Sequence, residues 1–209
     1  MKHRRGPYVA LDAQTHTLIA ATDNIVEGGR ELLEFYQRLA HAGLHLKYAT
    51  IDGNTQENKY LTKVWPEITI QRCFVHVQRQ GLSWCRRKPK RTDAKHLQTL
   101  FLELSHVKTH RHIQEYLHRV ELWEKRFGTP IQLTPGYGYV FSDLKRARSM
   151  LLKALPNLFH FITIPEIASS TNALEGYFSR LKQQYRKHRG LSPRHRKSFF
   201  LWYFYLIRK

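Results

Sequence analysis

HLKYATIDGNTQENKYLTKVWPEITIQRCFVHVQR, residues 45–79, gives the clearest indication of the fold class of this chain. Its first apolar run, residues 46–51, is too short for a helix and leads into an Asp-Gly pair, which predicts a strand followed by a tight turn. Asn54 is a candidate N-cap for a helix that ends before Pro66. Residues 68–75 then alternate as a second strand does. Strand, helix and strand in about thirty residues predict a parallel crossover unit of an α/β protein.

Asp52 stands at the carboxyl end of the first of these strands. In open α/β sheets, ligands and catalytic groups collect at that edge, so a carboxylate there is a candidate metal ligand. A turn-forming role beside Gly53 explains the same residue without any chemistry. Both interpretations stay open at this point.

The charge of the chain is its most informative overall property. The 209 residues carry a formal net charge of +19 at pH 7 and 13 His, which favours a polyanionic partner such as nucleic acid. An anionic membrane surface and a ribosomal type of RNA binding are the rivals. Two Cys form no disulfide framework, which suits a reducing compartment. The most apolar segment, residues 198–207, is too short to cross a bilayer, and we expect it to form a buried terminal helix.

The remaining segments predict a mixed α/β chain. Residues 8–13 and 17–22 alternate around a polar turn and predict a hairpin, which is followed by an amphipathic helix that Gly43 ends. Apolar residues at helical spacing predict two or three helices within residues 94–127 and another over residues 144–155. Residues 159–164 are expected to be extended.

Residues 169–172 offer N-caps for a helix with Glu175 in its first turn. A carboxylate at this position favours the helix dipole, which is a sufficient structural explanation on its own. The later part of this helix is strongly basic, with Arg180, Lys182, Arg186, Lys187 and Arg189. A basic helix that brings one carboxylate toward a distant second one is what metal-dependent phosphoryl transfer on nucleic acid needs.

Three further features have both a functional and a structural interpretation. Cys73 and His76 have the spacing of half a zinc site, although no second Cys pair exists and Cys85 would have to help complete it. Trp123 lies in the helical region and is by default a core residue. The run 86–91, with Arg86, Arg87 and Lys88, is a loop that is either solvated or in contact with nucleic acid.

Three blocks of sequence, in order along nearly the whole chain, resemble the Mutator-type transposases of bacterial insertion sequences. They are IDG at 51–53, QRCFVHVQR at 71–79 and TNALEG at 171–176, and both KHRGL at 187–191 and the Trp-Tyr-rich terminus resemble the same group. The resemblance implies a ribonuclease-H-like mixed sheet with a helical insertion before the last catalytic helix. The expected domains are residues 1–79, the first part of the core; residues 80–156, the insertion; and residues 157–209, the last part of the core.

In such enzymes, two Asp and one Glu bind Mg²⁺, or Mn²⁺ in its place, and the metal ions support DNA strand cleavage and strand transfer. The resemblance implies that Asp52 is the second Asp and Glu175 the Glu, and that both are metal ligands. Cys73 and His76 match the Cys-x2-His of the family and would organise the site without binding zinc. Asn172 matches the Asn that precedes the Glu, and Trp123 matches the Trp of the insertion.

The expected partners are the terminal repeats of the mobile element and target DNA, with no membrane. We also expect homo-oligomers when the protein is complete, and a cytoplasmic, nucleoid-associated location. The basic residues of the loop and of the helix are the candidate DNA ligands. A non-catalytic DNA-binding protein derived from a transposase is the alternative function, and an RNA-binding module is a third.

The first Asp of the family has no clear counterpart. In that fold it lies on the first of three antiparallel strands, and this chain shows two strands before its first helix. We therefore expect the first strand and its Asp to lie upstream of Met1, in a truncated or split transposase. The rival is that Asp12, one of two acids available in this region with Asp23, serves as the first carboxylate.

Overall fold

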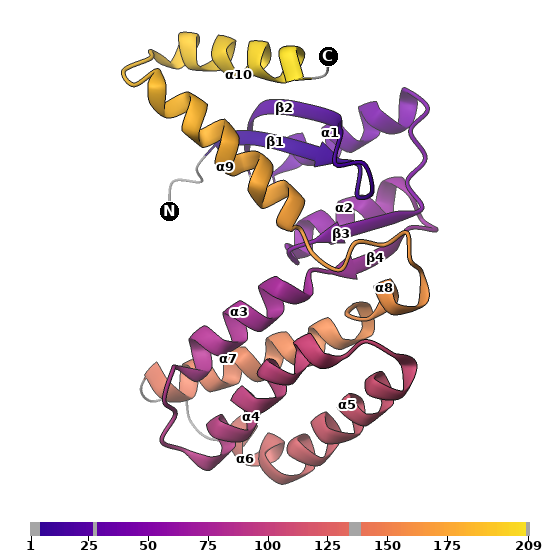
Figure 1. Ribbon diagram of the computed structural model, residues 1–209, viewed down its shortest axis with the longest axis vertical. Helices are drawn as coiled ribbons and strands as arrows, with labels where there is room; N and C mark the ends of the chain where they lie inside the picture. The colour runs from indigo at the N-terminus through magenta and orange to yellow at the C-terminus, as the bar shows by residue number, and fades with distance from the viewer. Residues whose placement is uncertain (1–4, 27–28, 134–138, 208–209) are drawn as a thin grey trace. The chain divides into compact units, whose positions relative to one another are not determined.

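The structure of the chain is a computed structural model that describes residues 5–26, 29–133 and 139–207, and it divides into two compact units (Figure 1). Unit 1 comprises Met1–Ile70 and Glu166–Lys209, and unit 2 comprises Gln71–Pro165. The chain is a mixed α/β protein in which helices predominate. The division into core and insertion at residues 79 and 156 stays a prediction.

Unit 1 contains two small sheets, in which β1 pairs with β2 and β3 pairs with β4. Its elements are β1 Arg5–Leu11, β2 Leu18–Val26, α1 Arg30–His41, β3 Tyr48–Ile51, α2 Thr55–Val64, β4 Thr69–Arg72, α9 Asn172–Lys187 and α10 Pro193–Ile207, of which β4 ends within the range of unit 2. The predicted hairpin is confirmed, because β1 and β2 are antiparallel with Val9 opposite Ala21.

The predicted strand, turn and helix at residues 46–64 are also confirmed. Gly53 has a φ of +101°, which favours glycine, and the Asn54 side chain accepts hydrogen bonds from the amides of Gln56 at 2.9 Å and Glu57 at 3.2 Å. The Thr69 amide donates to the Lys47 carbonyl at 2.9 Å, so the beginnings of β3 and β4 lie side by side. Two strands whose beginnings are adjacent run parallel, as the crossover unit requires.

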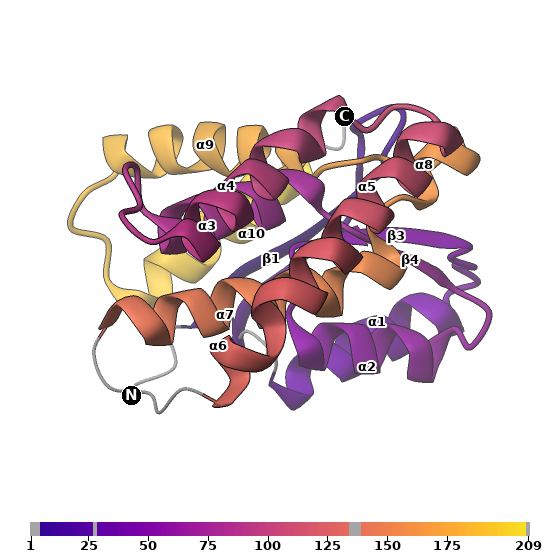
Figure 2. The same cartoon turned by 90° about the horizontal axis from the view of Figure 1, so that it is seen from below.

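Unit 2 is built from helices around one large core. Its helices are α3 Phe74–Cys85, α4 Thr92–Glu103, the 3-10 turn Leu104–His106, α5 His110–Trp123, the π-helical turn Glu124–Gly128, α6 Thr129–Leu133, α7 Tyr139–Ala154, the 3-10 turn Leu155–Asn157 and α8 His160–Thr163. Helix α3 packs against both α4 and α7 (Figures 1 and 2). The helices predicted within residues 94–127 and 144–155 are confirmed.

Two strand predictions in this region are wrong. The strand expected to continue to residue 75 ends at Arg72, and α3 begins at Phe74. Val77, Gly81 and Cys85 are buried at helical spacing in α3, so burial of this stripe against the helices of unit 2 overrides the strand preference of a Val-rich sequence. The segment 159–164, expected to be extended, contains the short helix α8.

The two C-terminal helices pack on the hairpin of unit 1. Helix α9 contacts β1 and α10 contacts β2, around a cluster formed by Val9, Tyr177, Leu181, Phe200 and Phe204. The expectation that the terminal helix is buried is wrong, because Phe200 and Phe204 are the buried residues of α10 and most of its other side chains are exposed. In the described parts of the chain, no helix is long and apolar enough to cross a membrane.

Candidate functional site: two carboxylates beside basic helices

Asp52 directly follows β3 and its side chain is exposed to solvent. One carboxylate oxygen, Oδ1, accepts a hydrogen bond from the Asn54 amide at 3.2 Å, as a turn-forming Asp does. The same residue therefore closes the turn before α2 and presents a carboxylate at the carboxyl end of a parallel strand. These two roles are compatible, because a carboxylate has about four lone-pair sites.

Glu175 lies in the first turn of α9, and its side chain is exposed. Its amide donates to the Thr171 carbonyl at 3.0 Å, so its backbone belongs to the regular helix. Asn172, the first residue of α9, is also exposed. A carboxylate in the first turn interacts favourably with the partial positive charge of the helix terminus.

One hydrogen bond connects the strand that carries Asp52 to the segment that leads into α9. The Thr50 hydroxyl donates to the Ala168 carbonyl at 2.6 Å, across 118 positions in the sequence. Both residues belong to unit 1, and Figure 1 shows this segment crossing beside β3. Thr50 lies two positions before Asp52, and Ala168 lies seven before Glu175. The fold thus anchors the two carboxylate-bearing segments to each other, and close approach of the two carboxylates stays a prediction.

Asp12 has a structural task in the turn between β1 and β2. Its Oδ1 accepts hydrogen bonds from the Thr15 amide at 2.7 Å, the Thr15 hydroxyl at 2.9 Å and the Gln14 amide at 3.0 Å. These bonds favour the ionised carboxylate and lower the pKa of Asp12 below its usual value. Asp12 follows β1 instead of lying on a strand, and the turn accounts for its carboxylate.

Glu57, five residues after Asp52, is likewise held in the fold. Its Oε1 accepts hydrogen bonds from the hydroxyls of Tyr8 and Tyr36, the second at 2.9 Å, and the two hydroxyls lie 2.6 Å apart. Burial, followed by the negative charge of Glu57, raises the pKa of both tyrosines. Across the described residues, no three His, Cys, Asp or Glu side chains gather into a group that could hold a metal ion.

Cys73 and His76 form a pair at the start of α3, in unit 2. Cys73 is fully buried at the N-cap position, and its Sγ lies 3.2 Å from Nδ1 of the half-buried His76. Cys85 lies at the other end of α3, where burial raises the pKa of its thiol to about 12. Trp123 is buried in the core of unit 2, and its indole donates to the Asp93 carbonyl at 3.1 Å.

The basic residues predicted on α9 are all exposed, and they continue into α10. Arg180, Lys182, Arg186, Lys187 and Arg189 lie on α9 or directly after it. Arg194, Arg196 and Lys197, which were not among the predicted DNA ligands, lie in the first turns of α10 and are exposed as well. The basic run PRHRK at residues 193–197 would have indicated these cations from the sequence. In the described structure, none of these eight cations belongs to an ion pair.

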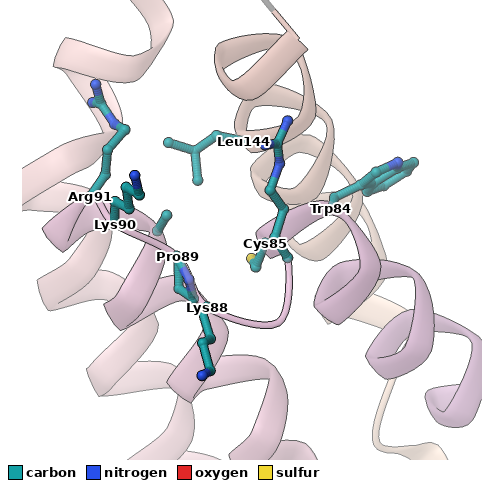
Figure 3. A pocket seen from close by; sticks show the side chains of 9 residues that line it. Trp84, Cys85, Lys88, Pro89, Lys90, Arg91 and Leu144 are labelled. Atoms are coloured by element: carbon teal, nitrogen blue, oxygen red, sulfur yellow. The ribbon is translucent and has the colours of Figure 1, made fainter.

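The loop between α3 and α4 forms a second basic surface. Arg86, Arg87 and Lys88 are exposed there, and the Gln98 side chain donates to the Arg86 and Arg87 carbonyls at 2.7 and 3.4 Å, which holds the loop in place. The loop borders a hollow of about 170 Å³. Figure 3 shows Cys85, Pro89 and Leu144 around this hollow, with the Lys88 and Arg91 side chains extending away from it.

The family model of the Mutator transposases matches residues 12–198, which is most of the chain. The chain belongs to the Mutator family of transposases. The matched region includes both candidate carboxylates, the Cys73–His76 pair and the two basic surfaces, and it ends before the apolar part of α10. No curated protein matches the chain.

The charge of this transposase is unevenly distributed. Residues 1–70 carry eight Lys and Arg against eight Asp and Glu, whereas residues 166–209 carry ten against two. In unit 2, by contrast, several cations are neutralised locally: Arg91 pairs with Asp93, Arg119 with Glu103 and Arg148 with Glu124. Residues 166–209, which include the last two helices of unit 1, therefore carry a net charge of +8, whereas residues 1–70 are neutral overall.

Proposed function

We propose that this transposase cleaves a DNA strand and joins the resulting end to a second DNA by metal-dependent phosphoryl transfer. The observation that carries the proposal is the Thr50–Ala168 hydrogen bond, which ties β3 to the segment that leads into α9, a helix that bears one carboxylate and many cations. We propose a ribonuclease-H-like core as the framework, because a parallel crossover with an Asp at the carboxyl end of its first strand suits that fold.

Asp52 and Glu175 have the ligand chemistry for Mg²⁺. Both are exposed carboxylates, and Mg²⁺ prefers oxygen ligands, of which one or two protein carboxylates with water and substrate phosphates are sufficient. A bound divalent ion at this place would activate the attacking oxygen and stabilise the charge that develops at the phosphate. In the proposal, the two residues hold the ion, and their own charges keep the site selective for divalent cations.

The cations of α9 and α10 hold the DNA. Arg186 and Lys187 follow Glu175 by eleven and twelve positions, which is about 17 Å along a helix at 1.5 Å per residue. A DNA backbone that follows α9 would therefore extend from the cationic end of the helix to the carboxylate end. Contacts to phosphates fix the register of the strand without reading its sequence.

Nicking of supercoiled plasmid in Mg²⁺ or Mn²⁺ tests this proposal. We expect any nicking by the wild-type chain to be lost in Asp52→Asn and in Glu175→Gln, while both variants retain duplex binding. Glu67→Gln is the matched control, because Glu67 is an exposed carboxylate of unit 1 outside the proposed site. Manganese binding followed by electron paramagnetic resonance reports the metal site independently of cleavage.

Two outcomes separate the proposal from its rivals. Tight duplex binding with no nicking in either metal, and no manganese binding that depends on Asp52, would favour the non-catalytic DNA-binding protein. Stronger binding to RNA than to DNA of the same length would favour the RNA-binding module. Equal nicking by the wild type and by Asp52→Asn would refute the assignment of that carboxylate.

A further inference from the structure

Helix α10 exposes large apolar side chains on the side that is not packed against the hairpin and α9. Trp202 is 64% exposed and Tyr205 is 56% exposed, whereas Phe200 and Phe204 on the other side of the helix are buried against the hairpin and α9. Leu201, Leu206 and Ile207 are also exposed. In Figure 1, α10 lies beside β2 at the edge of unit 1.

Cations and aromatic rings share this surface. Arg194, Lys197, Leu201 and Tyr205 recur at intervals of three and four residues, which places them on one side of a helix, and Trp202 is adjacent to them. Arg194 and Lys197 are exposed, and neither belongs to an ion pair within the described residues. We call the surface formed by Arg194, Lys197, Leu201, Trp202 and Tyr205 the α10 face.

We propose that the α10 face binds single-stranded DNA, with phosphates on Arg194 and Lys197 and unpaired bases stacked on Trp202 and Tyr205. The proposal rests on the DNA-binding role proposed above and adds a preference for unpaired nucleotides. Surfaces that bind single strands without reading sequence combine a cationic track with aromatic side chains on which bases stack. The α10 face has both components on one element.

The dimensions of the face suit a short run of nucleotides. Lys197 and Trp202 are five residues apart, which is about 7.5 Å along the helix axis, so one short run of nucleotides can reach both. The rings of Trp202 and Tyr205 meet edge to face, with centroids 5.9 Å apart and an interplanar angle of 86°. Because the two rings are nearly perpendicular, bases stacked on them would be splayed apart, which a flexible single strand permits and a duplex does not.

Charge and arrangement favour this occupant over two others. A second copy of the chain would bring Arg194 and Lys197 against another strongly cationic surface, since each chain carries +19. A helix that lies in a membrane interface keeps its cations on one side and its apolar residues on the opposite side. On α10, Arg194 and Lys197 recur at the spacing of Leu201 and Tyr205 and do not lie opposite them, and Phe200 and Phe204 are packed in the protein.

The test compares a fluorescently labelled single strand of mixed sequence with a duplex of the same length, using the full chain. We expect Trp202→Ala and Tyr205→Ala each to weaken single-strand binding by roughly five- to a hundredfold, the range that one lost stacking contact causes, with duplex binding unchanged. Trp202→Phe should retain most of the affinity. Leu206→Ala is the control, because Leu206 is 60% exposed on the same helix and offers no ring.

Three results would overturn the inference. The first is unchanged single-strand binding in both alanine variants. The second is an equal loss for single strand and duplex, which would show no preference for unpaired bases. The third is that Trp202→Ala lowers the oligomeric state in light scattering, or the binding of anionic lipid vesicles, without affecting single-strand binding. None of these results affects the proposed function if duplex binding still depends on Arg186 and Lys187 and nicking still depends on Asp52.

Discussion

Neutralising the end of α9 is the most direct test of the DNA-binding surface proposed for this transposase. Arg186 and Lys187 lie in the last turn of α9 and are exposed and unpaired in the described structure. The double variant Arg186→Gln/Lys187→Gln removes two charges from a surface that holds eight free cations between residues 180 and 197. Its overall charge falls from +19 to +17, so the long-range attraction of the whole chain for DNA is largely preserved.

The expected magnitude follows from counterion release. Each phosphate neutralised on B-form DNA contributes about −0.9 to the slope of log K against log salt concentration. If all eight cations contact phosphates, the wild-type slope is about −7, and the double variant should have a slope of about −5. Between 50 and 200 mM salt, the wild type would lose about four orders of magnitude in affinity and the variant about three.

Fluorescence anisotropy with duplexes of two unrelated sequences measures both slopes. The matched control is Arg111→Gln/Lys125→Gln, which also lowers the charge to +17 but removes cations that pair with Glu115 and Glu121 in unit 2. We expect the control to keep the wild-type slope. A control that flattens the slope as much as the α9 variant would show that overall charge, and not this surface, governs binding. A sequence-dependent loss with the slope intact would show that the contacts on α9 are not to phosphates.

Three further predictions concern stability and reactivity. Gln71 is fully buried; its side-chain amide donates to the Arg72 and Leu158 carbonyls and accepts from the Phe161 amide. Gln71→Ala should therefore lower the free energy of unfolding, measured in urea, by about 2–4 kcal/mol. The control Gln80→Ala, at an exposed position of α3, should change it little. Burial raises the pKa of the Cys85 thiol to about 12, so iodoacetamide at pH 8 should label Cys85 slowly in the native protein and rapidly in urea. Peptide mass spectrometry measures both rates, and rapid labelling of the native protein would contradict the burial of Cys85. The pKa of Asp12 is lowered in the folded state, so its contribution to stability is present above its unfolded pKa of about 3.9 and is lost as the pH falls through the folded value. Asp12→Asn should therefore have a lower free energy of unfolding than the wild type at pH 7, and urea titrations should show this difference shrinking below about pH 4. A difference that stays constant with pH would rule out the titration of Asp12 as its cause.

Signals that act over a few residues were sufficient to predict much of the local structure. The helix cap at Asn54, the end of that helix before Pro66 and the hairpin predicted over residues 8–22 all depend on neighbours close in sequence, and the structure confirms them. The start of α3 was missed because Phe74, Val75 and Val77 favour a strand locally. Their helical state depends on helices α4 and α7, which lie far along the chain.

The candidate site shows the same division between local signals and contacts made by distant segments. The order of residues alone establishes which carboxylates and cations the chain possesses, the order of its motifs and its resemblance to Mutator transposases. The tertiary structure decided that the Thr50 strand is bound to the segment before α9, that Asp12 and Glu57 are engaged in the fold, and that α10 leaves its aromatic residues exposed. Residue type and spacing are local properties, whereas burial and hydrogen-bond partners depend on which distant segments meet, and these contacts form only when the whole chain folds.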